Sequence, residues 1–362
     1  MITYEEVYKA YLNCRKGKSN KVNTMKFEKD LELNLLEITE SLNNKTYSPK
    51  RSISFAVSYP KSREIIAADF RDRVVHHVLY KHLNPIYEKI FIHDSFACRK
   101  GKGTLKAVKR LQRFTRSITE NSKKHAYYLQ LDIQNFFMSI DKNILLRIIK
   151  KKNFENDIQW IAETIINHNP SINCINKTSK DKVPAHKLLS NQPKNKGLPI
   201  GNLTSQFFAN IYLNELDQFI KHKLKVKYYL RYVDDFVLLS KSKQQLKDWA
   251  IQIEDFLEIN LSLKLKQLIK LQPISNGINF VGAIIKPSHL LPRNRNIAEM
   301  NRKINIHLST NPVNPGKLQA SINSYFGQLK HYSANKIPEA TFKKHEKLKE
   351  LFDPNGYCVG LK

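Results

Sequence analysis

Cysteine is scarce in this sequence, and its four copies are scattered as Cys14, Cys98, Cys174 and Cys358. No CxxC pair is present, so the spacing supports neither a zinc site nor a disulfide framework. Apolar runs are short as well, since no stretch of about 18 apolar residues could cross a membrane and no signal peptide is evident. We therefore expect a soluble cytoplasmic protein with reduced thiols.

Acidic residues are few relative to basic ones. Lys and Arg total 61 against 32 Asp and Glu, which gives a formal net charge of +29 and a pI near 9.8. An excess of this size indicates a polyanionic partner, and nucleic acid is the simplest choice. The basic loop from Ser95 to Thr104 lacks the GxxxxGK spacing of a nucleotide-binding phosphate loop. Its Arg99, Lys100 and Lys102 are instead expected to follow a nucleic-acid backbone.

Carboxylates gather at the ends of two expected strands. The stretch "YYLRYVDDFVLLSKS" predicts a β-hairpin with Asp234 and Asp235 at its turn, where two negative charges call for a nearby cation. Alternating apolar residues from Tyr127 to Ile133 predict a second strand that leads to Asp132. Three carboxylates so placed suit two Mg²⁺ ions about 3.5–4 Å apart, the arrangement for in-line phosphoryl transfer. The alternative is an acidic turn that faces solvent.

Three stretches, two of which contain these aspartates, resemble in their order along the chain the motifs of a known family. "LDIQNFF" resembles the first palm motif of the reverse transcriptases, "GLPIGNLTSQFFANIYLNELD" the second and "YVDD" the third. Within that family, "IGNLTSQ" and "SYFGQLKH" most resemble the enzymes of diversity-generating retroelements. The resemblance runs from about Lys50 to Lys330 and implies an α+β right-hand polymerase with fingers, an antiparallel-sheet palm and a helical thumb.

The chain divides into three expected parts. Residues 1–125 form an N-terminal cap and part of the fingers, 126–290 the palm with a polar loop inserted at about 168–196, and 291–362 a helical thumb and tail. Helical periodicity covers residues 1–44, a hairpin bent at Pro60 follows, and the next helix ends at Asn84 because of Pro85. The apolar and basic residues of "LSLKLKQLIKL" alternate as in a strand. Three thumb helices are expected over 297–308, 315–331 and 339–351.

The resemblance assigns the catalytic and metal-binding roles. Asp132, Asp234 and Asp235 are the implied catalytic residues, and together with Ile133 they are the implied ligands of two Mg²⁺ ions. The neighbouring His76 and His77 point about 100° apart on a helix, so we expect them to be structural or to face RNA rather than to share a metal.

The resemblance also implies a nucleotide site. Its residues are Lys61, Arg63, Asn135, Phe136, Phe137, Ile200, Gly201, Gln206 and Lys266, and Gly282 joins the nucleic-acid-binding set as part of a primer-holding hairpin. Phe137 stands where the family excludes a 2′-hydroxyl, which implies deoxynucleotides, and Lys266 is assigned to protonation of pyrophosphate. Plain alternatives remain open: a solvated turn for Lys61 and Arg63, a core residue for Phe137, and an ordinary hydrophobic contact for Ile200.

The function implied is an RNA-directed DNA polymerase that makes cDNA from a retroelement template RNA. Because Ile200 offers bulk but no hydrogen bond, we connect it with errors opposite template adenine. Expected partners are template RNA, the RNA/cDNA duplex, dNTPs and a basic pentameric accessory protein, in a prokaryotic or phage-encoded system. The alternatives are a retron or phage-defence reverse transcriptase of ordinary fidelity, and an RNA-binding protein without catalysis.

Overall fold

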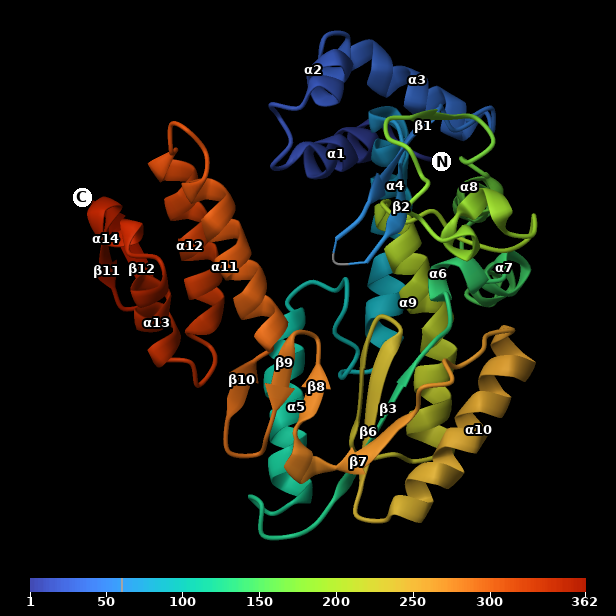
Figure 1. Ribbon diagram of the computed structural model, residues 1–362. Coiled ribbons are helices and arrows are strands. Elements are labelled where there is room, and N and C mark those ends of the chain that lie inside the picture. Colours follow the sequence, from blue (N-terminus) through green and yellow to red (C-terminus); the bar gives the residue numbers. More distant parts are fainter. Residues whose placement is uncertain (60) are drawn as a thin grey trace. The chain divides into compact units, whose positions relative to one another are not determined.

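A computed structural model describes residues 1–59 and 61–362 (Figure 1). Its mixture of helices and mostly antiparallel strands confirms the expected α+β class. Two compact units can be distinguished. The first unit contains residues 1–101, 131–236 and 248–269, and the second unit contains residues 102–130, 237–247 and 270–362.

Three amphipathic helices open the first unit and confirm the helical periodicity expected there. They are α1 (Tyr4–Arg15), α2 (Val22–Glu28) and α3 (Leu31–Asn43). A capping box starts α1, in which the Thr3 hydroxyl accepts from the Glu6 amide and the Glu6 carboxylate accepts from the Thr3 amide. Residues Leu35, Ile38 and Leu42 form the buried stripe of α3. Both α1 and α3 pack against α4.

Helix α4 (Phe70–Ile90) continues through Pro85, so the helix end predicted at Asn84 is wrong. Proline inside a helix costs about 3 kcal/mol because one hydrogen bond is lost and the ring crowds the preceding turn. Burial on the far side of Pro85 offsets this cost. Tyr87 is 1% exposed, and its ring packs against the rings of Phe91 and Phe207. Helix α9 (Leu203–Gln218) lies beside α4 (Figure 1). Its residues are buried on most of the helix circumference.

Shorter helices complete the first unit. Their bounds are α6 (Phe136–Ser139), α7 (Lys142–Lys150), α8 (Asn156–Asn167) and the π-helical turn η3 (Phe219–Lys223). Helix α10 (Lys243–Leu261) begins in the second unit and ends in the first. Across the described residues, no helix combines the length and the apolar character that a membrane crossing requires.

The expected hairpin is present as β1 (Ser52–Val57) and β2 (Arg63–Ala67), which pair antiparallel; the bend predicted at Pro60 lies outside the described residues. The polar segment 168–196 is not a plain loop. Its strand β4 (Cys174–Asn176) pairs parallel with β1, and two 3₁₀ turns follow, η1 (Ala185–Lys187) and η2 (Leu189–Asn191). The segment is anchored because the buried Glu64 carboxylate accepts from the Leu189 amide at 2.9 Å and pairs with Lys180 at 2.6 Å.

A four-stranded sheet has the order β5-β6-β3-β7. Its strands are β3 (Tyr127–Asp132), β5 (Tyr229–Tyr232), β6 (Asp235–Ser240) and β7 (Lys270–Pro273). The turn between β5 and β6 consists of Val233 and Asp234, whereas Asp235 already begins β6. The strand predicted from residue 261 onward begins only at Lys270. Before it, Leu265 makes an isolated bridge with Ile133 and no continuous strand.

The second unit holds a small sheet of order β10-β9-β8. The elements concerned are α5 (Thr104–Ile118), the 3₁₀ turn η4 (Ile274–Asn276), β8 (Ile278–Phe280), β9 (Ala283–Ile285) and β10 (Leu290–Pro292). Helix α5 packs on β9, and its Arg116 donates to the carbonyl of Pro287 at 2.6 Å.

The C-terminal helices share a core of their own in the second unit. They are α11 (Asn294–Leu308), α12 (Pro315–Leu329), α13 (Lys336–Lys344) and α14 (Lys347–Leu351), followed by the hairpin β11 (Phe352–Asn355) and β12 (Cys358–Leu361). Leu318, Ile322 and Phe326 of α12 are fully buried, and α11 runs alongside (Figure 1). No strand was predicted in the C-terminal tail, where the hairpin lies; its turn consists of Gly356, with a φ of +57°, and Tyr357.

Candidate active site

Two carboxylates meet where neighbouring strands end. Asp132 is the last residue of β3, and Asp234 lies in the turn that leads into the adjacent strand β6. Burial, followed by the negative charge of Asp132, raises the pKa of Asp234 to about 6. Asp235 is partly buried at the start of β6. The structure therefore brings Asp132 and Asp234 together in the first unit, with Asp235 next in the chain.

A lysine shares this site. The ammonium of Lys266 pairs with Oδ2 of Asp132, and its charge counteracts the rise in the pKa of Asp234. The backbone explains the contact, because the Lys266 amide donates to the Asp132 carbonyl and the Gln134 amide donates to the Lys264 carbonyl, both at 2.9 Å. These bonds flank the Ile133–Leu265 bridge, and the Ile133 side chain is fully buried.

A glycine loop lies between β2 and the start of α9. The Ile200 carbonyl accepts from the Ile66 amide at 2.8 Å, and Gly201 adopts a φ of +133°. A Cβ on Gly201 would stand 3.0 Å from the Ile66 carbonyl oxygen, so only glycine allows this approach. The partly buried side chains of Phe137 and Ile200 pack against the same small cluster, which includes Ile66 and Met138. The structure thus groups two of the implied nucleotide-binding residues.

Other implied nucleotide-binding residues lie at β2, before α6 and on α9. Lys61 and Arg63 are exposed at the start of β2. Asn135 holds a left-handed conformation with a φ of +46° and leads into α6, where the ring of Phe136 is buried against that of Phe137 at 5.5 Å. Gln206 is exposed on the first turn of α9, and its amide oxygen accepts from the Cys98 thiol at 3.4 Å.

The implied nucleic-acid-binding residues are divided between the units. Arg99 is 6% exposed, and its guanidinium is engaged by Glu88 and by the carbonyls of Ile92 and Ser95, so it braces its own loop from inside. Lys100 is exposed in the first unit. Lys102 belongs to the second unit, as does Gly282, which has a φ of +92° in the turn between β8 and β9.

Comparison with known protein families identifies the family to which this chain belongs. Residues 49–285 match the family model described as reverse transcriptase (RNA-dependent DNA polymerase). The chain is a member of the reverse transcriptase family. The matched region contains Asp132, Asp234, Asp235, Lys266 and the glycine loop, so the carboxylate pair lies within the part that defines the family.

Two curated proteins are similar to this reverse transcriptase. An uncharacterized 91 kDa protein in the cob intron of Schizosaccharomyces pombe is 28% identical over 189 residues, which are 51% of this chain and 21% of that protein. Protein YkfC of Escherichia coli is 21% identical over 267 residues, 65% of this chain and 66% of that protein. The chain therefore spans about a fifth of the length of the first relative and just under two thirds of the second.

A solved structure supports the fold. Telomerase from Candida tropicalis, in complex with a fragment of telomeric RNA, superposes with a TM-score of 0.50 at 13% identity. The superposition covers 87% of this chain and 60% of the telomerase chain. At that identity the likeness concerns the fold alone, and it agrees with a polymerase fold shared with telomerase reverse transcriptase.

Reverse transcriptase domains generally use divalent ions, typically Mg²⁺. Within 1–59 and 61–362, no group of three His, Cys, Asp or Glu side chains is arranged to hold a metal. The pair Asp132 and Asp234 nevertheless supplies hard anionic oxygens, which Mg²⁺ prefers. Oδ1 of Asp132 is buried without a hydrogen-bond partner, and Oδ2 carries the Lys266 ammonium. Both observations fit a site built for positive charge.

A buried arginine supports the turn that carries Asp234, and the sequence reading missed it. Arg231 of β5 pairs with Asp217 of α9, and both side chains are 0% exposed. Val233, the first turn residue, has a φ of +56°, which costs a β-branched residue about 1–3 kcal/mol. An Arg within the apolar strand "YYLRYV" was the available signal, since a charge in a buried strand needs a partner.

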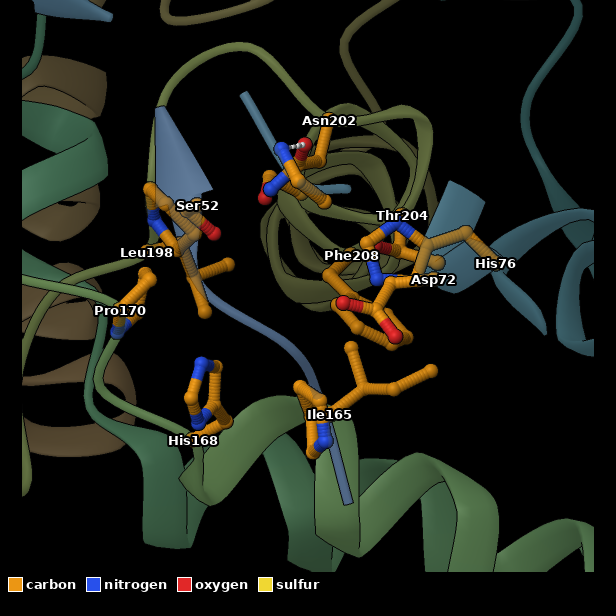
Figure 2. Close-up of a pocket in the computed structure, with 14 residues that line it drawn as sticks. Ser52, Asp72, His76, Ile165, His168, Pro170, Leu198, Asn202, Thr204 and Phe208 are labelled. Carbon is orange, nitrogen blue, oxygen red and sulfur yellow. Dashed lines mark hydrogen bonds between the residues drawn. The ribbon is translucent and has the colours of Figure 1, made fainter. Parts of the chain in front are cut away.

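A small cavity behind the glycine loop is lined by α4, α8 and α9 (Figure 2). Its volume of about 20 Å³ is enough for one water molecule. His76 and His168 lie on opposite sides of it, and burial lowers the pKa of His76 to about 3. Burial also lowers the pKa of His77 to about 4, so both neighbouring histidines are neutral at physiological pH, which suits a structural role.

Proposed function

We propose that this chain is an RNA-directed DNA polymerase that copies a template RNA into cDNA. The observation that carries the proposal is the facing pair of carboxylates, Asp132 and Asp234, at the ends of neighbouring strands within the reverse transcriptase region. The raised pKa of Asp234 supports it, because two carboxylates are held close together against their mutual repulsion. Such strain is characteristic of functional sites.

In this mechanism the chain's own residues position the reactants. Asp132 and Asp234 would hold two Mg²⁺ ions, with Asp235 and the backbone of Ile133 in support. When bound, such ions lower the pKa of the primer 3′-hydroxyl and neutralise charge on the phosphates. Lys266, which contacts Asp132, is close enough to the carboxylates to act on the leaving pyrophosphate.

Other residues would bind and select the nucleotide. Lys61 and Arg63 are exposed and suit a triphosphate, because a guanidinium can bond two phosphate oxygens at once. Phe137 and Ile200 pack against one apolar cluster. In this proposal Phe137 would contact the sugar and Ile200 the base. We place the cap and fingers at 1–125, the palm at 126–290 and the thumb at 291–362. The net charge of +29 supports binding to template RNA and the RNA/cDNA duplex.

We further propose that the enzyme belongs to a diversity-generating retroelement and makes errors opposite template adenine. The support is Ile200, a residue without hydrogen-bonding groups at the position expected to check the nascent pair, together with Gln206 in "IGNLTSQ". Shape alone discriminates weakly between similar substrates. A structured template RNA and a basic pentameric accessory protein are the partners this lineage implies.

The test is extension of a DNA primer on a defined RNA template with Mg²⁺ and dNTPs, followed by sequencing of the products. Wild type should extend the primer, and Asp234→Asn should lower the rate at least about 100-fold, because one of two charged ligands is lost. Lys264→Met is the control for loss of a charge outside the carboxylate pair. Equal activity of Asp234→Asn and wild type would refute the catalytic assignment.

The lineage is tested by the errors in those products. Errors concentrated opposite adenine, and reduced by Ile200→Gln, would support the mutagenic enzyme. Accurate copying of adenine in the presence of the accessory protein would refute that lineage and favour an ordinary prokaryotic reverse transcriptase. RNA binding with no extension under any condition would favour a protein without catalysis.

A further inference from the structure

Arg231 is the largest of the fully buried side chains of the chain's described part, and it carries a charge. Its Nε and Nη2 donate to the two carboxylate oxygens of Asp217 at 2.8 and 2.6 Å. Such a buried pair is weak evidence of a stabilising role, because apolar residues of the same shape often serve as well. Stability alone therefore does not account for a charged pair at this place.

The remaining nitrogen of Arg231 reaches the catalytic turn. Nη1 donates to the carbonyl of Val233 at 2.9 Å and to Oδ1 of Asn210 at 3.2 Å. Val233 directly precedes Asp234 and adopts a φ of +56°, which a β-branched residue keeps only where its surroundings hold it. The bond from Arg231 acts on the strained residue itself.

Arg231 is itself held on every side. Its amide donates to the Asp94 carbonyl and its carbonyl accepts from the Phe96 amide, both at 3.0 Å. Asp217 also accepts from the Tyr229 hydroxyl at 2.6 Å, and Asn210 donates to the Ala97 carbonyl at 2.8 Å. Helix α9 and residues 94–97 thus form a fixed frame from which the guanidinium reaches the turn.

We propose that Arg231 is a positioning residue that clamps the Val233–Asp234 turn to helix α9 and so holds Asp234 opposite Asp132. The proposal rests on the function proposed above, in which these two carboxylates are catalytic. Its purpose is geometric: a fork-shaped side chain can bond Asp217 with two nitrogens and the turn with the third. A misplacement of about 1 Å in such a site costs about 100-fold in rate.

The first variant is Arg231→Lys, which keeps the charge beside Asp217 but offers one nitrogen where the arginine offers three. We expect kcat per competent enzyme, counted from the burst amplitude, to fall about 10- to 100-fold, with the KM for dNTP within about twofold of wild type. Ile38→Ala is the stability control, because Ile38 is fully buried in α3, away from the turn. It should lower the melting temperature without lowering kcat per competent enzyme.

A second substitution separates the clamp from ordinary structural support. Glycine accepts a positive φ without strain, so Val233→Gly should let the turn keep its shape without the clamp. We expect the double variant Arg231→Lys/Val233→Gly to recover at least about fivefold of the lost kcat. A residue that only neutralises Asp217 would show no such rescue.

The outcomes separate this inference from the function on which it depends. Normal kcat per competent enzyme in Arg231→Lys, with Asp234→Asn inactive, would overturn the clamp and leave the catalytic assignment intact. Loss of kcat without rescue by Val233→Gly would also overturn it. If Arg231→Lys fails to fold, Asn210→Ala is the deciding variant, because it keeps the ion pair between Arg231 and Asp217. A fall in kcat of at least about threefold would support the clamp, and an unchanged kcat would refute it.

Discussion

The ion pair between Lys266 and Asp132 places a protein cation on an oxygen that we assign to Mg²⁺. Lys266→Met removes this competitor, so the variant should bind Mg²⁺ more tightly than the control Lys264→Met. Lys264 is exposed two residues away, and its replacement changes the net charge equally. Any difference between the two variants therefore reports the contact with Asp132 rather than the long-range field.

The size of the effect follows from exposure. The side chains of Lys266 and Asp132 are 40% and 34% exposed, so solvent screens the pair to about 0.2–1 kcal/mol. At about 1.4 kcal/mol per tenfold, this predicts an apparent Mg²⁺ dissociation constant about 1.4- to 5-fold lower in Lys266→Met than in Lys264→Met. Polymerisation should nevertheless fall in Lys266→Met, because the proposed proton donor is gone.

The assay is Mg²⁺ titration of the melting temperature without nucleic acid, at pH 8 and pH 6. The pKa of Asp234 is already raised to about 6, and loss of Lys266 raises it further, so protons compete with Mg²⁺ more strongly at the lower pH. The advantage of Lys266→Met should thus be largest at pH 8 and shrink at pH 6. Equal or weaker Mg²⁺ binding than in Lys264→Met at pH 8 would refute the competition.

Two further predictions concern parts of the first unit away from the carboxylates. Gly201→Ala should destabilise the protein by more than about 1 kcal/mol and raise the KM for dNTP, because the added Cβ would lie 3.0 Å from the Ile65 side chain. The control is Gly316→Ala, where the added Cβ makes only an ordinary contact, so this variant should be near neutral. Chemical denaturation and primer extension measure the two effects. Burial raises the pKa of Asp72 from 3.8 to about 6, so the folded state binds this proton more tightly than the unfolded state does. The free energy of unfolding should therefore increase as the pH falls from 6 towards 4. The difference in unfolding free energy between wild type and Asp72→Asn should change by up to about 3 kcal/mol over that window, and a constant difference would contradict the shift.

Local patterns predicted the elements that carry the site. Alternating apolar residues were sufficient for β3. The apolar runs on both sides of the two aspartates were sufficient for the hairpin of β5 and β6, whose strands are buried on both faces. The exact turn differed by one residue, since Val233 rather than Asp235 occupies it. A turn with positive φ usually favours Gly or Asn, so a Val there gives no local signal.

Features that depend on distant parts of the chain were not predictable in this way. Lys266 reaches Asp132 only because Ile133 pairs with Leu265 across more than a hundred residues of sequence. Helix α4 passes Pro85 because tertiary burial of Tyr87 offsets a local cost. Neither contact leaves a mark in the periodicity of one segment, and their discovery required the three-dimensional arrangement.

The strand β4 has a practical meaning for engineering. The segment that contains it is fastened at both ends to the β1–β2 hairpin, at one end by the parallel pairing of Ser54 with Asn176 and at the other by the bond from the Leu189 amide to Glu64. Between these fastenings, Asp181 and Lys182 are exposed. A fluorophore or a short peptide tag inserted there would stay fastened to the β1–β2 hairpin, so its signal would test whether the hairpin changes position when RNA and dNTP are added.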